Sequence, residues 1–586
     1  MSVLEWALVV GINGAIIGFG FWKSRGPQRS VDWFLAARSL PWWMVGLSMF
    51  ATAVDSGDYV AVAGAAYQQG LPYISAWWIG LTAGWCLMTW VILLPMYRGG
   101  MYTNCEYLEY RFGPAARVIA VLIQLQSRTN VLANVAFSLY LTFSILTGWD
   151  ANTWWLVVGI ALAAAAYTAS GGLKSVAITD SMQSVVMLVA AIVLWWSVWD
   201  HVGGWDGLES RLSEHVASGV LRSDVAHAMT HVGGTTKPGT PPWLPVVGFA
   251  LVMSSYCVIN QSQAMRMLAA RSIWDLRMAA VVASGVTVVV MWFNVTLGVM
   301  GRAVMPELST GDLVFPKLVE QFLIPLGGGL TGIVVAGLLA GGISTYDSVG
   351  SALASVFTRD IYARFIVRRA DDRHYLRVSR CATFAVIALS FVYIPFLKQG
   401  MVALYLKLVG VAVMPLLTIY VMGVLTPVAR ASGTVGLLVG IACGLTRFAD
   451  PLTRRWFEFA LPDWWINIWW GYLWSCGITA VTMVAVSIVR GWISREERER
   501  LAQGSSLVAE QRSAVPGAAV AVDHAPSVDP QEQGSDWLVV SRQMVSQAIA
   551  DDGVPETESR PWWTAPALWT ILLVSIVLLL NLVIYW

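Results

Sequence analysis

Apolar stretches long enough to cross a bilayer recur along most of the chain. A helix needs roughly 20 predominantly apolar residues to span the hydrocarbon core of a membrane. About fourteen segments meet this condition, near residues 4–22, 41–66, 73–97, 114–147, 152–170, 175–199, 243–267, 278–303, 326–357, 380–397, 400–427, 432–448, 465–490 and 564–585. The pattern predicts an all-α polytopic membrane protein.

Polar side chains interrupt the ninth of these segments, "AGGISTYDSVGSALASVFTRDIY" (340–362). They recur at three- and four-residue steps, which places them along one helix face: Ser344, Asp347, Ser348, Ser351 and Ser355. Serine in a membrane helix can bond back to its own backbone, so a purely structural stripe is one interpretation. An ionisable group inside a span is expensive, however, so we expect Asp347 to face a cavity, a counter-charge or a cation. The pattern favours a cation-binding face.

A second polar interruption lies in the span near 41–66. Within "GLSMFATAVDSGDYVAVAGAAYQQG" (46–70), Asp55, Ser56, Gly57 and Asp58 fall near mid-membrane. Glycine and aspartate weaken a helix, which favours a locally unwound segment whose freed carbonyls must find partners. A cation is one such partner, and a hard cation binds several oxygens. We therefore expect the broken helix and the polar stripe to form one site.

Composition supports a membrane protein and gives no sign of nucleic-acid binding. Apolar residues make up 57% of the chain and charged residues 12%, with a net charge of +1. The charged fraction is about half that of ordinary soluble domains, and no basic stripe stands out. The six cysteines are scattered singly. Tryptophan pairs at predicted span ends, such as Trp77 and Trp78, are typical of membrane interfaces.

The positions of Lys and Arg predict the orientation in the plasma (cell inner) membrane. Most lie in alternate connections, near 23–40, 98–117, 171–175, 266–277 and 358–380. These connections are expected to be cytoplasmic, which puts both termini on the extracytoplasmic side. Residues 200–242 then form an extracellular loop, and residues 492–562 form a polar cytoplasmic linker before the final span at 563–586.

Five motifs resemble the sodium:solute symporter family, which includes sodium/sugar, sodium/proline and sodium/sialic acid co-transporters. They are "DWFLAARSLPWWMVGLSMFAT", "LLPMYRGGMYTNCEYLEYRFG", "YTASGGLKSVAITDSMQ", "NQSQAMRMLAAR" and "STYDSVGSALASVFTRDIY", and they occur in the family's order between about residues 30 and 430. The resemblance implies a five-plus-five inverted-repeat fold of the leucine-transporter type. Its repeats would be 41–199 and 243–427, preceded by a first span and loop (1–40) and followed by two additional spans (428–491).

The same resemblance implies the ligands of the coupling ion, sodium. The family's common sodium site corresponds to the carbonyls of Ala51, Val54 and Gly341 and to the hydroxyls of Ser344 and Thr345. Some members have a second cation site, which here would comprise Asp180, Ser344, Asp347 and Ser348. Asp347 departs from the pattern, because the matched position is usually a hydroxyl. Coupling to one sodium ion, to two, or to sodium and a proton are all open at this point.

The solute is less clearly indicated than the ion. Sugar-transporting members use a glutamate, an asparagine and a lysine, which align with Ile79, Asn260 and Thr287, so only the asparagine is present. Arg128 roughly matches the arginine that engages the carboxylate in sialic acid transporters, and a bidentate guanidinium suits that role. An ion pair with Asp55 or Asp58 is an equal alternative for Arg128. A carboxylate-bearing or zwitterionic solute leads, with sugar as the alternative, and the expected substrate-binding residues are Asp55, Asp58, Arg128, Asn260 and Gln261.

Two other classes of function are weaker interpretations of the sequence. We expect no enzyme, since no catalytic signature occurs in a plausible context. His227 and His231 are four residues apart but lie in an exterior loop, so no metal other than sodium is expected. A symporter-like solute sensor is a minor alternative, because residues 492–560 contain no kinase-like segment and are followed by a further span.

Overall fold

The computed structural model describes residues 1–23, 30–236, 240–397, 401–447, 461–497, 537–538 and 561–586. Secondary structure in these ranges is helical, and their one isolated β-bridge joins Leu40 to Ala270. Eleven helices, or twelve with one bent pair, are long and apolar enough to cross a membrane by length and composition. The remaining two expected spans correspond to the broken pair near 42–69 and to the shorter apolar helix Ser432–Thr446. The expected helical, polytopic architecture is therefore present.

The first expected repeat begins with a broken helix. Its elements are α3 (Trp42–Ala53), α4 (Ser56–Gln69), the span Leu71–Arg98 that includes α5 (Thr82–Leu87) and α6 (Leu93–Arg98), α7 (Asn104–Phe112), α8 (Pro114–Thr147), α9 (Thr153–Gly171) and α10 (Leu173–Val202). The second repeat also begins with a break, at Asn260, where the chain bends by 56°. Its elements are α13 (Trp243–Ile259), α14 (Gln261–Leu268), α15 (Ile273–Val304), α16 (Val314–Leu318), α17 (Leu330–Val356), α18 (Asp372–Ser390), α20 (Met401–Leu408) and α21 (Met414–Leu425).

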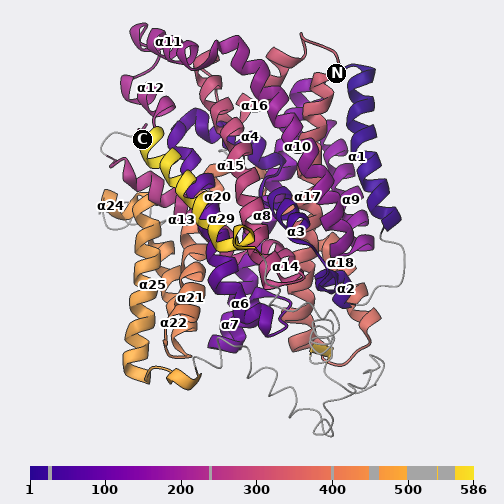
Figure 1. Ribbon diagram of the computed structural model, residues 1–586, viewed down its shortest axis with the longest axis vertical. Coiled ribbons are helices and arrows are strands. Elements are labelled where there is room, and N and C mark those ends of the chain that lie inside the picture. Colours follow the sequence, from indigo (N-terminus) through magenta and orange to yellow (C-terminus); the bar gives the residue numbers. More distant parts are fainter. Residues whose placement is uncertain (24–29, 237–239, 398–400, 448–460, 498–536, 539–560) are drawn as a thin grey trace.

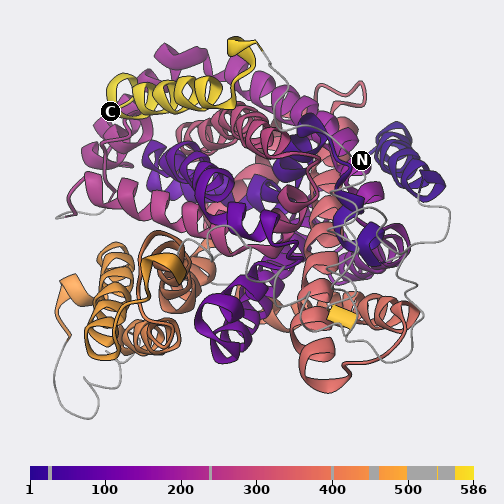
Figure 2. The same ribbon diagram turned by 60° about the horizontal axis from the view of Figure 1, so that its bottom comes forward.

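Further helices surround the two repeats. They are α1 (Val3–Lys23), α2 (Ser30–Leu35), α11 (Gly204–Ala217), α12 (Ser223–Thr230), α22 (Ser432–Thr446), α24 (Asp463–Ile466), α25 (Ile468–Arg490) and α29 (Pro566–Leu579). Figure 2 shows α22 and α25 side by side at one edge in orange, and α29 along another edge in yellow. These peripheral helices leave α17 enclosed.

α17 is the central helix of the bundle. It packs against α10, α1, α9, α8 and α18, and nearly all of its side chains are buried. Its polar stripe therefore faces protein and not lipid. This position removes the conflict between an apolar span and a row of hydroxyls, because neighbouring helices supply the partners that lipid lacks.

The two termini lie at the same end of the molecule. The Val232 amide of the predicted extracellular loop donates to the Tyr585 carbonyl at 2.5 Å, and the Glu5 backbone packs against Gly332 at the start of α17. The indole nitrogen of Trp537, a residue of the predicted linker, donates to the Asp372 carboxylate at 2.8 Å. α11 and α12 lie at the top of Figure 1 and α7 toward the bottom.

Glycine allows α4 to lie unusually close to its neighbours. A Cβ atom on Gly298 of α15 would lie 2.2 Å from the Ala63 carbonyl oxygen of α4. A Cβ atom on Gly64 would lie 2.7 Å from the carbonyl carbon of Gly311. Small residues at helix interfaces in membranes let backbones approach in this way. The break in the first repeat is thus held by tight backbone packing.

We expect Gly298→Ala to destabilise the protein, because the added methyl group collides with the backbone of α4. The loss should be about 1–3 kcal/mol, typical of overpacking, measured as the thermal unfolding midpoint in detergent. Gly285→Ala is the control on the same helix, since a Cβ atom there meets no atom within 4 Å. Equal effects of the two substitutions would contradict this account.

Candidate functional site

The backbone is interrupted between α3 and α4, as the sequence predicts. Val54 (φ −118°, ψ 112°) and Asp55 (φ −124°, ψ −176°) are extended. Asp55 accepts from the Asp58 amide at 3.0 Å, and Asp58 accepts from the Asp55 amide at 3.1 Å. This reciprocal capping satisfies the first amides of α4 and stabilises the break. The aspartates thus act as a cap, which is a more specific role than weakening a helix.

Gly57 has a different role from the one that the sequence suggests. It lies within α4, and a Cβ atom there would come within 2.8 Å of the Asp55 carboxylate. The absence of a side chain leaves room for that carboxylate and for the backbone of α8 at Asn134.

α17 faces this break with the residues expected at the sodium site. The Ser344 hydroxyl lies 3.0 Å from the Ala51 carbonyl oxygen. A Cβ atom on Gly341 would lie 3.3 Å from the backbone of Asp55 and Ser56, so the two backbones nearly touch. The Thr345 hydroxyl is buried and has no hydrogen-bond partner in the described residues. The structure therefore brings Ala51, Gly341, Ser344 and Thr345 together, next to buried Val54.

Arg266 lies among the residues expected at the second cation site. Its guanidinium donates to the Asp180 carboxylate at 2.8 Å and, within a very short distance, to Ser348. It also donates to Ser48 at 2.7 Å, and both ions of the Arg266–Asp180 pair are completely buried. Arg266 is not among the site residues predicted from the sequence. The rule that singled out Arg128, an ionisable group inside an apolar segment, would have found it.

Asp347 takes no part in the hydrogen bonds of this cluster that join described residues. It contacts Thr168 of α9, and its second oxygen has no hydrogen-bond partner in the described part of the chain. The structure therefore separates Asp347 from the other expected second-site residues, although all lie on one helix.

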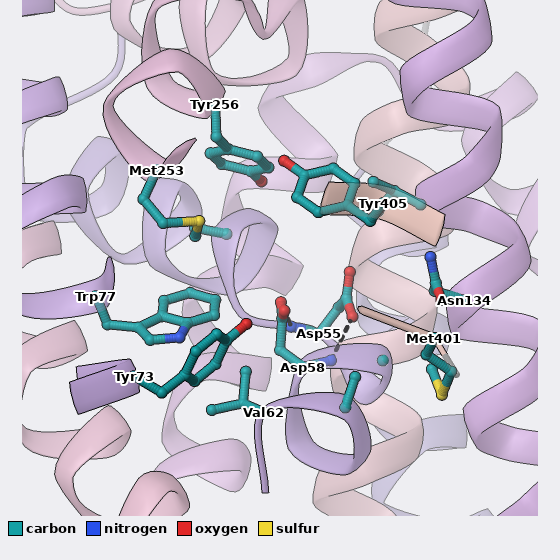
Figure 3. Close-up of a pocket in the computed structure, with 14 residues that line it drawn as sticks. Asp55, Asp58, Val62, Tyr73, Trp77, Asn134, Met253, Tyr256, Met401 and Tyr405 are labelled. Atoms are coloured by element: carbon teal, nitrogen blue, oxygen red, sulfur yellow. Dashed lines mark hydrogen bonds between the residues drawn. The ribbon is translucent and has the colours of Figure 1, made fainter. Parts of the chain in front are cut away.

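A pocket opens beside the break between α3 and α4 (Figure 3). Its empty volume is about 580 Å³, with the space at its mouth included. Asp55 and Asp58 lie in the middle of its wall, with Tyr73 and Trp77 on one side and Tyr256 and Tyr405 on the other. The remaining lining residues are Ala53, Gly57, Ala61, Val62, Val131, Asn134, Met253 and Met401. Two carboxylates among aromatic rings favour a positively charged group.

Trp77 corrects one expectation from the sequence. It belongs to a pair that was predicted to anchor the protein at the membrane interface, but only 2% of its surface is exposed. It lines the pocket, because the helix that carries it is packed between others.

Arg128 is buried and forms no direct ion pair among the described residues, although Asp55 and Asp58 lie within reach of its charge. None of its three guanidinium nitrogens has a hydrogen-bond partner in the described residues, and its guanidinium lies 4.6 Å from the centre of the Tyr256 ring. No direct contact joins its nitrogens to Asp55 or Asp58 among the described residues, so any attraction between them acts at a longer distance. Tyr256 lines the pocket and Arg128 does not. The guanidinium thus lies behind the aromatic wall.

Asn260 and Gln261 do not line this pocket. The side-chain amide of Gln261 accepts from the backbone N–H of Asn104 at 2.9 Å and donates to the backbone carbonyl of Tyr102 at 2.8 Å. Asn260 caps α14 by accepting from Ser262 at 3.0 Å. Both side chains stabilise the break between α13 and α14, a role that depends on contacts distant in sequence.

Ion pairs connect the elements on the predicted cytoplasmic side. Arg117 pairs with Asp360 and with Glu109, Arg364 pairs with Glu109 at 2.8 Å, and Arg359 pairs with Glu106 at 3.1 Å. Burial alone would raise the pKa of Glu109, but the hydrogen bonds and charges of Arg364 and Arg117 outweigh it and lower this pKa. The pairs hold α7 and α8 against the helical segment Phe357–Ile366 that follows α17.

A comparison with known proteins connects this geometry to a family. The model of the sodium:solute symporter family matches residues 33–440, more than half of the chain. The chain belongs to the sodium:solute symporter family. It is therefore a multi-pass membrane transporter and not an enzyme, and sodium is its coupling ion.

Individual members of the family are distant from this chain in sequence. Human sodium/glucose cotransporter 4 is 27% identical over 534 residues, 83% of this chain and 76% of that protein. Rat sodium/myo-inositol cotransporter 2 is 27% identical over 470 residues, 74% of this chain and 68% of that protein. A Na⁺-coupled sialic acid symporter solved in an outward-open state has a TM-score of 0.69 at 18% identity, covering 84% of this chain and 99% of that one. The family's inverted-repeat fold is confirmed.

We expect Arg128→Met to stabilise this symporter, because the substitution removes a buried guanidinium whose nitrogens have no hydrogen-bond partner among the described residues. The thermal unfolding midpoint should rise. Arg266→Met is the matched control: it leaves Asp180 buried and unpaired and should cost about 3–5 kcal/mol. A fall in the midpoint for Arg128→Met would show that this side chain stabilises the fold.

Proposed function

We propose that this symporter imports a small zwitterionic solute together with sodium, which binds at Ala51, Val54, Gly341, Ser344 and Thr345. The observation that carries the proposal is the pair of carboxylates, Asp55 and Asp58, at the break between α3 and α4, where the pocket and the sodium ligands meet. In this proposal the linker is cytoplasmic and both termini are extracytoplasmic.

The hydroxyl of Ser344 has more acceptors near it than hydrogens to donate, which supports the sodium site. Its hydroxyl lies 2.7 Å from the Asp180 carboxylate and 3.0 Å from the Ala51 carbonyl oxygen, but it has a single hydrogen to donate. A carboxylate is the stronger acceptor, so the hydrogen goes to Asp180. The Ser344 and Ala51 oxygens then face each other with no hydrogen between them. A cation beside both oxygens removes this repulsion, and the free Thr345 hydroxyl supplies a further ligand.

The pocket supports an amine-bearing solute. An ammonium group between Asp58 and the rings of Tyr73 and Trp77 gains both charge pairing and cation–π attraction. The carboxylate of a zwitterion would extend toward Tyr256, behind which Arg128 has unused donors. Rotation of Tyr256 would let the guanidinium meet that carboxylate, and the two opposite charges would be satisfied together.

Sodium drives import by favouring one state of the transporter. An ion bound between α17 and the broken helix ties the two together, which stabilises the arrangement that binds solute. Sodium and solute then raise each other's affinity by the same factor. The membrane potential adds about 2.3 kcal/mol per charge per 100 mV, enough to concentrate a neutral solute tens-fold for each sodium ion.

A sugar or polyol is the second candidate, because relatives are named for glucose and myo-inositol. Ile79 and Thr287 replace two of the polar groups expected for sugar binding, and neither lines the pocket. The zwitterion therefore remains the leading proposal.

Substitution at the sodium site tests the ion assignment. In the double variant Ser344→Ala/Thr345→Ala, the sodium concentration that half-saturates binding should rise about 10- to 100-fold, equivalent to about 1.5–3 kcal/mol of lost oxygen contacts. Sodium-dependent thermal stabilisation measures this. Ser351→Ala is the control, since its hydroxyl bonds within α17 at 3.2 Å. An unchanged sodium requirement in the double variant would show that Ser344 and Thr345 are not sodium ligands.

A panel of solutes tests the substrate class. We expect amino acids and betaines to raise the unfolding temperature in sodium but not in potassium, and their uncharged analogues to fail. Asp58→Asn should abolish the response while leaving stabilisation by sodium alone intact. If glucose or myo-inositol stabilises the protein and no zwitterion does, the sugar candidate is correct.

A further inference from the structure

The exposed face of α18 changes from charged to apolar along the helix. The opposite face packs against α17, where a Cβ atom on Gly350 would lie 3.3 Å from the Thr383 methyl group and 3.4 Å from Ile387. An exposed apolar helix face in a membrane protein meets the hydrocarbon of the bilayer. In the second half of α18 the exposed positions are of this kind: Phe384, Ala385, Ala388 and Leu389.

The first half of the same face carries arginines. Arg373, Arg377 and Arg380 are exposed, and their spacing of four and three residues places them on one side of the helix. Phe384 follows Arg380 at the next step of four residues. The face therefore changes from guanidinium groups to hydrocarbon within about one helical turn. This is the order in which a membrane-spanning helix crosses from the headgroup layer into the acyl chains.

Five exposed arginines make up a surface that we call the arginine face. Three lie on α18 and two just before it: Arg368, Arg369, Arg373, Arg377 and Arg380. None of them belongs to a salt bridge between described residues. Arg368 and Arg377 each donate to a backbone carbonyl one turn earlier, and this neutral acceptor leaves their charge in place. Positive charges grouped beside a membrane span attract anionic lipids.

The two aspartates between these arginines have other partners. Asp371 accepts from the backbone amide of His374 at 3.1 Å. Asp372 accepts from the backbone amide of Ser30 at 2.9 Å and from the indole of Trp537 at 2.8 Å. Both carboxylates therefore hold parts of the protein together, and five arginines against two aspartates leave the surface with a net positive charge.

We propose that the arginine face binds the headgroup of an anionic phospholipid, whose acyl chains lie along the apolar half of the same helix face. Guanidinium groups pair with phosphate in a bidentate manner, and a soluble anion would make no use of the adjoining hydrocarbon. No residue of α18 lines the transport pocket, so this lipid is not a transported solute. Because α18 packs against α17, the lipid restrains the helix that supports the sodium ligands.

Short-chain lipids added to the purified full-length protein in a neutral detergent test this proposal. Dioctanoyl phosphatidylglycerol should raise the thermal unfolding midpoint in a saturable way, because it binds the folded state, and dioctanoyl phosphatidylcholine should not. In Arg373→Gln/Arg377→Gln/Arg380→Gln, the half-saturating concentration should rise about 100-fold, equivalent to about 1 kcal/mol for each arginine. Arg373→Lys/Arg377→Lys/Arg380→Lys keeps the charge and should keep most of the response.

The matched control removes the same charge from exposed arginines that share no helix face, in Arg98→Gln/Arg430→Gln/Arg490→Gln. Arg98 ends α6, Arg430 precedes α22 and Arg490 ends α25. The half-saturating concentration should stay close to that of the wild type. Glycerol 3-phosphate, which carries the phosphate without acyl chains, should not raise the midpoint.

Equal effects of the two glutamine variants would overturn the proposal, because the response would then follow the overall charge. A response to glycerol 3-phosphate would overturn it in favour of a site for soluble anions. A lower midpoint of the α18 glutamine variant in the absence of added lipid would show that these arginines pair within the protein. If that variant fails to fold, the wild type decides: KCl should weaken the stabilisation by phosphatidylglycerol through screening, and a salt-independent response would contradict the proposal.

Discussion

The unpaired backbone between α3 and α4 is the constraint on which the rest of the structure depends. Inside a membrane, every carbonyl released from a helix must find a partner within the protein. Asp55 and Asp58 accept from each other's backbone amides at the start of α4, and Ser344 lies against the Ala51 carbonyl. α17 must therefore run beside the break, at the centre of the bundle. The Ser344 oxygen lies beside the Ala51 carbonyl oxygen, and the two together suit a cation.

Charge balance separates the structural groups from the candidate binding groups. Arg266 and Asp180 neutralise each other in full burial and are enclosed by hydroxyls. Within the described residues, Arg128 has no directly bonded partner and Asp347 has only Thr168. A buried charge without a partner is unstable unless a ligand or a proton completes it. The unbalanced groups lie beside the pocket and beside the sodium site, which is where a transporter must bind and release its cargo.

Because the backbones are tightly packed, binding of an ion or a solute at these sites affects whole helices. α4 is held against α15 and the Gly311 segment through glycine, so it cannot shift without moving its neighbours. Ser344 links the break to Asp180, and Asp180 links α10 to α14 through Arg266. A cation at Ser344 is therefore connected through direct contacts to four helices, α3, α17, α10 and α14. Such connections are the physical form that coupling between ion and solute requires.

The sequence by itself determined the helical membrane architecture, the break near Asp55 and the polar face of α17. These features follow from hydropathy and helical period, which are local properties of the chain. Only the tertiary structure decided that Arg266 lies within the Asp180 cluster, that the Gln261 side chain forms hydrogen bonds with backbone groups and that Trp77 lines the pocket. It also separated Asp347 from Ser348, because neighbouring residues on a helix point about 100° apart. Which helix stands opposite each of them is a long-range property that no local pattern contains.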